Sequence, residues 1–156
     1  MTFLEIAKQV ILRRDDTEFI YIADGELQEQ MQDWIINNNL TDKIHMLGFR
    51  NDSAEIVGAF DVYLSSALYE GLPYSMIEAM RPGVPIIATD CIGNNELVFE
   101  GDNGWMYPVK NVAKGAELVV KQIDNEIIQS DKVLAAFNLK FSLTRMLENV
   151  EREYQL

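Results

Sequence analysis

The sequence contains very few of the residues that build metal sites and nucleophilic active sites. It has one cysteine and one histidine among 156 residues, Cys91 and His45. A structural zinc site takes four ligands, and a Cys/His catalytic pair needs both side chains in contact. We therefore interpret both residues as structural and expect no metal and no cofactor. A lone cysteine also excludes an internal disulfide, which is typical of the cytoplasm.

Basic residues are also scarce, with 13 Lys and Arg against 25 Asp and Glu and a net charge of −12. Nucleic-acid binding needs clusters of Lys and Arg, so nucleic acid is excluded as a partner, and docking on an anionic membrane is disfavoured. No apolar run approaches the ~20 residues that span a bilayer. The first helical pattern, at 2–14, includes Glu5 and does not resemble a signal peptide. We expect a cytoplasmic protein.

Short apolar segments alternate with helical patterns along the chain. Strands are expected at 19–22, 44–47, 62–64, 85–88 and 104–107, and helices at 2–14, 27–37, 55–60, 73–80, 94–99, 113–123, 127–137 and 143–154. This alternation predicts a parallel sheet with helices on both faces. The continuous apolar run 85–88 agrees, because parallel strands are buried on both sides. We expect one α/β domain with a Rossmann-like sheet and C-terminal helices.

The segment 70–80 carries the most informative pattern. Glu70 and Glu78 are separated by Gly71 and a helix-starting Pro73. Glu70 is expected in the loop after a strand, and Glu78 about two turns into the next helix. Proline is favoured at the first helical position, and the free N–H groups of a helix start attract anions. Carboxylates beside such a site suit a nucleotide sugar. Two solvated glutamates on a surface helix are the alternative.

With its surroundings, this segment resembles the Glu-x7-Glu motif of retaining glycosyltransferases of family 4, also called group 1. The other stretches that resemble the family, in the family's order, are 22–27, 44–49, 59–63, 83–90, 93–96 and 102–105. The resemblance covers nearly the whole chain and only the C-terminal, donor-binding half of the two-domain GT-B fold. It implies transfer of a sugar from a UDP- or GDP-sugar to a glycan or lipid-linked acceptor, in polysaccharide biosynthesis.

The resemblance also implies roles for residues of the motif. Glu70 would be the catalytic position and bind a hydroxyl of the transferred sugar, and Glu78 would bind the ribose hydroxyls. The N–H groups of Gly71 and Leu72 would receive phosphate oxygens. The common proposal for the family needs no protein nucleophile, which fits the scarcity of histidine and cysteine.

Further binding residues are expected at the carboxyl ends of the first two strands, where open α/β sheets bind their ligands. Gly25 and Gly48 lie in these loops, and glycine lets the backbone approach a ligand closely. The resemblance implies that the turn from Gly48 to Arg50 lies near the base. Arg50 and Lys43 are the only basic residues that we place near this mouth.

Part of the family's pattern cannot be matched. Family sequences usually carry a strand, a Gly-Arg turn and a Lys-Gly pair before the first helix, and these hold the donor diphosphate. We therefore expect residues 1–156 to form a domain that is incomplete at its N-terminus and truncated at its first strand. The missing N-terminal domain would bind the acceptor and could attach the protein peripherally to the inner membrane. The isolated chain is expected to be inactive.

Two other segments are interpreted as structural. The asparagines of Gly93–Glu96 are expected to cap a short helix, since asparagine is a good N-cap, and contact of this segment with the donor sugar is the alternative. An apolar stripe at helical spacing is expected to be a packing face, which self-association could cover in the isolated chain. The residues of this stripe are Leu143, Met146, Leu147, Val150 and Tyr154.

Three other functions are compared with glycosyl transfer. One is a free-standing nucleotide-sugar-binding or interaction module. Another is a fragment of a sugar-nucleotide 2-epimerase, although such a site is expected to pair histidine with acidic residues, and His45 is the only histidine. A glycosidase is less well supported, because it needs a facing acid and base, which the x7 spacing does not supply.

Overall fold

The structure is a computed structural model, and it describes residues 1–125 and 127–154. The elements, in chain order, are α1 (Thr2–Ile11), β1 (Phe19–Tyr21), α2 (Gln28–Asn37), β2 (Ile44–Met46), α3 (Ser53–Ile56), the 3₁₀ helix η1 (Val57–Ala59), β3 (Tyr63–Ser65), α4 (Tyr74–Met80), β4 (Ile86–Asp90), α5 (Asn94–Leu97), β5 (Gly104–Pro108), α6 (Val112–Asn125), α7 (Ser130–Lys140) and α8 (Leu143–Tyr154). The predicted alternation is confirmed, with boundaries that shift by a few residues. None of the described helices combines the length and apolar character needed to cross a membrane.

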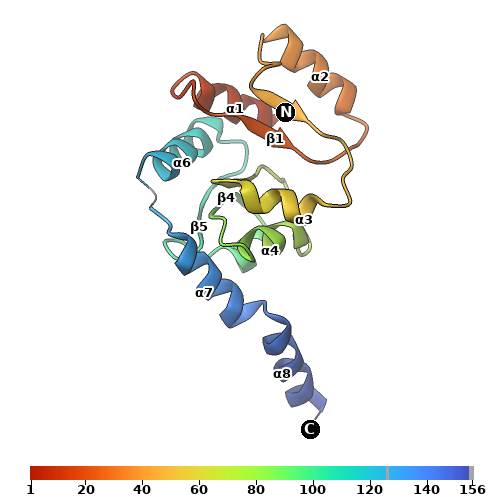
Figure 1. Ribbon diagram of the computed structural model, residues 1–156, viewed down its shortest axis with the longest axis vertical. Helices are drawn as coiled ribbons and strands as arrows, with labels where there is room; N and C mark the ends of the chain where they lie inside the picture. Colours follow the sequence, from red (N-terminus) through yellow and green to blue (C-terminus); the bar gives the residue numbers. More distant parts are fainter. Residues whose placement is uncertain (126, 155–156) are drawn as a thin grey trace.

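The strands form two parallel sheets, where we expected one continuous sheet. One sheet pairs β1 with β2, and the other has the order β3-β4-β5 (Figure 1). The N–H of Phe19 donates to the carbonyl of Lys43 at 2.8 Å, and the N–H of Tyr63 donates to that of Pro85 at 2.9 Å. Within the described residues, β1 and β3 therefore each have a strand on one side only. Their other edges carry free backbone groups.

One apolar core connects the two sheets beneath α1 and α6. It combines Phe19 of β1 and Ile44 of β2 with Ile87 of β4, and α1 contributes Leu4, Ile6, Ala7 and Val10. Gly115 of α6 lies against α1, because a Cβ at this position would be 2.7 Å from Cδ1 of Ile6. The two helices therefore pack closely and hold both sheets from one side.

A second core covers the opposite face of the three-stranded sheet. Ile86 and Ala88 belong to this core, whereas Ile87 between them belongs to the first. Side chains alternate along a strand, so the two cores lie on opposite faces of β4. Met76 of α4 and Val133 of α7 complete the second core. Helices therefore cover both faces, which confirms the predicted Rossmann-like layering.

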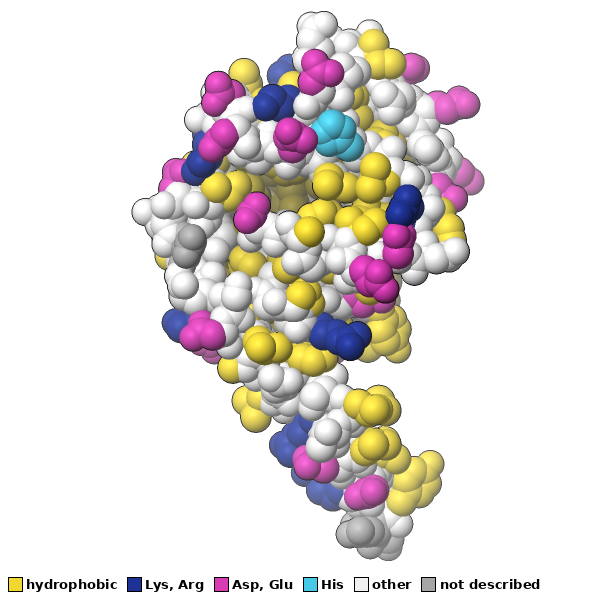
Figure 2. Space-filling view, viewed as in Figure 1, with side chains coloured by type: hydrophobic (Ala, Val, Ile, Leu, Met, Phe, Trp, Pro, Cys, Tyr) yellow, Lys and Arg dark blue, Asp and Glu magenta, His cyan; other side chains and the backbone are white. Residues whose placement is uncertain are grey.

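The apolar stripe of α8 is exposed, so its expected packing partner is not found in the described part of the chain. Leu143 is 68% exposed and Tyr154 is 87% exposed, and the three residues between them in the stripe are exposed as well. The helix extends away from the two sheets beyond α7 (Figure 1), and Figure 2 shows its hydrophobic side chains along one side of this extension.

The core beneath α1 predicts the effect of a substitution in that helix. We expect Ile6→Ala to lower the free energy of unfolding by about 2–5 kcal/mol, because it leaves a cavity at a fully buried position. Urea denaturation followed by circular dichroism measures this change. The control is Leu12→Ala at the end of the same helix, where the side chain is 77% exposed and we expect a change within about 0.5 kcal/mol. Equal effects of the two substitutions would contradict the packing described here.

Candidate functional site

Glu70 and Glu78 lie on the segment that follows β3. Glu70 is partly exposed in the loop before α4, as predicted, and Glu78 is exposed on α4. Pro73 is the N-cap residue, so the helix begins at Tyr74, one residue later than expected. Glu78 is therefore a little more than one turn into the helix, and not two.

Both carboxylates influence the hydroxyl of Tyr63, the first residue of β3. It lies 2.8 Å from Oγ of Ser75 on the first turn of α4. Burial raises the pKa of Tyr63, the hydrogen bond with Ser75 lowers it, and the negative charges of Glu70 and Glu78 raise it further. The charges of Glu70, in the loop before α4, and of Glu78, on α4, thus both disfavour the phenolate of Tyr63.

The loop that carries Glu70 rests on the end of β4 and on the residues that follow it. Oγ1 of Thr89 donates to the carbonyl of Ala67 at 2.6 Å, and the N–H of Glu70 donates to the carbonyl of Ile92 at 3.1 Å. Within the described part of the chain, the N–H groups of Gly71 and Leu72 make no such bond. They are exposed at the same edge of the sheet.

The other predicted binding residues, Gly25, Gly48 and Arg50, lie in the loops after β1 and β2, on the other sheet. Gly25 follows β1, and Gly48 follows β2 with a left-handed φ of +67°, a conformation that favours glycine. Nε and Nη2 of Arg50 donate to the two carboxylate oxygens of Asp52 at 2.8 and 2.6 Å. This pairing raises the pKa of Arg50 and lowers that of Asp52. The charge of Arg50 is therefore already balanced.

The placement of Lys43 near the mouth of the site is wrong. Lys43 comes directly before β2, and its carbonyl accepts from the N–H of Phe19, the first residue of β1. It therefore lies at the amino ends of these strands, opposite the loops of Gly25 and Gly48. Its ammonium group donates to the carbonyl of Asp15. Since Lys43 precedes the strand predicted at 44–47, the sequence pattern already placed it at the amino end, away from the carboxyl ends where ligands bind.

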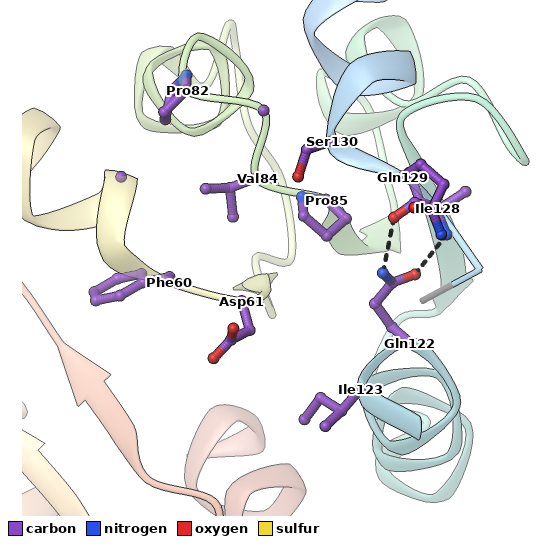
Figure 3. A pocket seen from close by; sticks show the side chains of 12 residues that line it. Phe60, Asp61, Pro82, Val84, Pro85, Gln122, Ile123, Ile128, Gln129 and Ser130 are labelled. Carbon is purple, nitrogen blue, oxygen red and sulfur yellow. Dashed lines mark hydrogen bonds between the residues drawn. The ribbon is translucent and has the colours of Figure 1, made fainter. Parts of the chain in front are cut away.

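The larger of the two cavities that we describe is lined by residues of the segments 58–61, 82–85 and 122–130 (Figure 3). It has a volume of about 290 Å³, and Asp61 and Pro85 line it just before β3 and β4. Gln122 lines it too and exchanges two hydrogen bonds with the backbone of Ile128, at 2.9 and 3.0 Å. A second cavity of about 30 Å³ lies beside Gly25. Neither cavity is lined by Glu70 or Glu78.

Sequence analysis missed the part that Thr89, Gly93 and Asn94 play at this edge. We expected an asparagine cap for α5, but the N-cap is Gly93 and Asn94 is the first helical residue. Nδ2 of Asn94 bonds to the carbonyl and Oγ1 of Thr89 at 3.0 and 3.1 Å. The side chain of Asn94 therefore bonds to the end of β4 and does not cap α5. The sequence signal for this contact was a threonine at the end of an apolar strand, with Gly93 and Asn94 four and five residues later.

Comparison with protein families decides the family of this chain. The model of the family described as "Glycosyl transferases group 1" matches residues 1–125. The chain belongs to this family. The fold agrees, since its parallel sheets with helices on both faces match the C-terminal domains of GT-B glycosyltransferases.

Three similar proteins show how much of a group 1 glycosyltransferase the chain represents. The chain is 29% identical over 146 residues to UDP-Gal:alpha-D-GlcNAc-diphosphoundecaprenol alpha-1,3-galactosyltransferase of Escherichia coli, which covers 88% of this chain and 38% of the relative. Among solved structures, a complex of S. aureus TarM with fondaparinux, alpha-GlcNAc-glycerol and UDP has a TM-score of 0.88 at 22% identity, covering 97% of this chain and 31% of TarM.

The C-terminal domain of LpcC from Francisella tularensis is the third similar protein. It has a TM-score of 0.79 at 20% identity and covers 91% of this chain and 78% of that domain. The chain thus spans less than half of the E. coli relative and of TarM, and about four fifths of a structure that contains a C-terminal domain only.

The environment of Tyr63 leads to a prediction about the two carboxylates. We expect Glu70→Gln and Glu78→Gln each to lower the pKa of Tyr63, because each removes a negative charge that disfavours the phenolate. NMR titration of the ¹³Cζ resonances of tyrosine measures this pKa. Glu29→Gln, on the exposed surface of α2, is the control and should leave it unchanged. If only one of the two site substitutions shifts the pKa, the carboxylates do not share this region.

Proposed function

We propose that the chain is the donor-binding half of a retaining glycosyltransferase that transfers a sugar from a nucleotide-diphosphate sugar to a glycan or lipid-linked acceptor. The observation that supports this proposal is the position of Glu70 in the loop after the carboxyl end of β3, with Glu78 on the helix α4 that follows. Ligands of open α/β sheets bind at this edge. Family membership supports the reaction class.

The donor contacts follow from the chemistry of the loop after β3. The carboxylate of Glu70 would accept a hydrogen bond from a hydroxyl of the transferred sugar, and Glu78 would accept from the ribose. The N–H groups of Gly71 and Leu72 have no acceptor in the described part of the chain and would donate to phosphate oxygens. Gly25, Gly48 and Arg50 belong to the other sheet and would approach the base.

Retention of configuration without a covalent glycosyl-enzyme intermediate requires the acceptor to attack from the side of the leaving group. In the proposed step, the acceptor oxygen bonds to the anomeric carbon as the bond from that carbon to the diphosphate oxygen breaks. A phosphate oxygen takes the proton of the acceptor hydroxyl, so no protein nucleophile is needed. The chain would orient the donor and stabilise the leaving diphosphate.

We propose UDP as the nucleotide of the donor and a lipid-linked or polymeric glycan as the acceptor. The name of the E. coli relative contains UDP-Gal and a diphosphoundecaprenol acceptor, and TarM was solved with UDP. These similarities support a UDP-sugar over a GDP-sugar. The carboxylates described above would serve any hexose, so the sugar itself would depend on other contacts.

We further propose that the domain is incomplete at its N-terminus and that a strand from a longer polypeptide completes its sheet. Every residue of β3 is partly exposed, whereas four of the five residues of β4 are buried. Figure 2 shows hydrophobic side chains around a hollow between the part that holds α1, α2 and β1 and the part below it. The common Rossmann order, 3-2-1-4-5-6, corresponds to β2-β1-gap-β3-β4-β5 with its first strand missing.

The missing strand would affect donor binding directly. In such folds the ligand lies where the strand order reverses, next to the first strand. A helix start contributes only about 0.3–1 kcal/mol toward an anion, whereas micromolar affinity needs about −8 kcal/mol. The chain also has a net charge of −12, which opposes a diphosphate. We therefore expect weak donor binding and no transfer from residues 1–156 alone.

The proposed role of Glu78 is tested in the full-length enzyme that contains this chain. We expect Glu78→Ala to weaken UDP binding about ten- to a hundredfold, because a hydrogen bond to a charged group is worth about 1.5–3 kcal/mol. Isothermal titration calorimetry measures the affinity. Glu29→Ala on α2 is the matched control and should bind UDP as the unsubstituted enzyme does. Unchanged affinity in the Glu78 variant would refute the assignment.

A further inference from the structure

A group of buried residues at the end of β4 contacts the loop that carries Glu70. Thr89 and Asn94 are fully buried polar residues, and Gly93 lies between them and the loop. None of the three has a role in the donor contacts proposed above. We call Thr89, Gly93 and Asn94 the β4 corner.

The hydroxyl of Thr89 is held in one orientation. Its oxygen accepts a hydrogen bond from Nδ2 of Asn94 at 3.1 Å, and its single proton goes to the carbonyl of Ala67 at 2.6 Å. Asn94 is itself fixed by a bond from Nδ2 to the carbonyl of Thr89 at 3.0 Å. A hydroxyl has only one proton to donate, so the contact with Asn94 directs that proton to the loop.

Gly93 fixes the same loop by close packing. A Cβ at Gly93 would lie 2.5 Å from the carbonyl oxygen of Glu70 and 2.8 Å from that of Gly71. These are backbone atoms, so only displacement of the loop could relieve the clash. The φ of Gly93 is +89°, a conformation that further favours glycine. The N–H of Glu70 donates to the carbonyl of Ile92, which is the residue directly before Gly93.

Stability alone does not explain why an asparagine occupies position 94 of the β4 corner. Oδ1 of Asn94 is buried and has no hydrogen-bond partner among the described residues. A buried polar atom without a partner is unfavourable, and an apolar residue of similar size would avoid it. Local rules of this kind are broken mainly at functional sites. An asparagine at this position is explained if its side-chain amide is needed to orient the hydroxyl of Thr89.

We propose that Thr89, Gly93 and Asn94 are positioning residues, which fix the Glu70 carboxylate and the Gly71 N–H against the bound donor. This inference rests on the proposed function. The loop residues 68–69 and 71–72 are exposed, and Glu70 is partly exposed. Binding geometry must be held to within about 0.5 Å, and a misplacement of about 1 Å can reduce the rate about a hundredfold.

The test uses the full-length enzyme with a UDP-sugar and compares two buried asparagines. Asn94→Leu breaks the contact with Thr89. Asn103→Leu is the matched control, because Asn103 is also fully buried but bonds to Leu97 and Phe99, away from the Glu70 loop. We expect Asn94→Leu to lower kcat about ten- to a hundredfold with KM for the donor changed less than threefold. Asn103→Leu should leave kcat per folded molecule unchanged.

A second pair of variants tests the hydroxyl of Thr89. Thr89→Val keeps the shape and removes the proton donor, and we expect the same loss of kcat. Thr89→Ser keeps the donor and should restore most of the activity. Hydrogen exchange followed by mass spectrometry should show faster exchange of the peptide 66–73 in Thr89→Val, with peptides from α1 and α6 unchanged.

The outcomes separate this inference from the proposed function. Equal losses of kcat in Asn94→Leu and Asn103→Leu would overturn the positioning role, as would a faster-exchanging loop with full activity. No turnover of any UDP-sugar by the unsubstituted enzyme would instead refute the proposed function. In that case the exchange of peptide 66–73 would still decide whether the β4 corner fixes the loop: unchanged exchange in Thr89→Val overturns it.

Discussion

The packing of α1 against α6 is the contact on which the arrangement of the two sheets depends. α1 leads into β1 of one sheet, whereas α6 follows β5 of the other, and within the described residues no strand pairing joins the two. The absence of a side chain at Gly115 lets α6 approach Ile6, so one core includes residues from both sheets. Helix packing therefore determines where the loops after β1 and β2 lie relative to the loop that carries Glu70.

Under the proposed function, the charges at these loops would make the chain alone a poor site for a diphosphate. Glu70 and Glu78 would provide acceptors for hydroxyl groups, and among the described residues neither carboxylate is in an ion pair. Arg50 is paired with Asp52, and Lys43 lies at the amino ends of the strands. Placing a diphosphate beside two carboxylates is unfavourable unless positive charge is supplied nearby. Under the proposed function, that charge would come from the polypeptide that also supplies the missing strand.

Sequence reasoning succeeded where local pattern determines structure and was less successful where distant segments meet. The apolar run before Asp90 predicted a strand buried on both faces, and the Gly and Pro positions predicted the loop of Glu70. The division into two sheets was not predicted, because the alternation of helices and strands does not show which strands pair. The cap of α5 was missed because Asn94 bonds backward to Thr89, and that partner depends on the tertiary fold.

Stability and donor binding are coupled in this arrangement. A strand between β1 and β3 would satisfy the free backbone groups of both edges and bury more of β3, so it would fix the two sheets in one relative position. A donor that contacts the loops of both sheets stabilises the same position, because a ligand favours the conformation that it binds best. Completion of the sheet should therefore raise donor affinity even without new contacts to the donor. The β4 corner acts at shorter range, since it holds one loop against its own sheet whether or not the second sheet is in place.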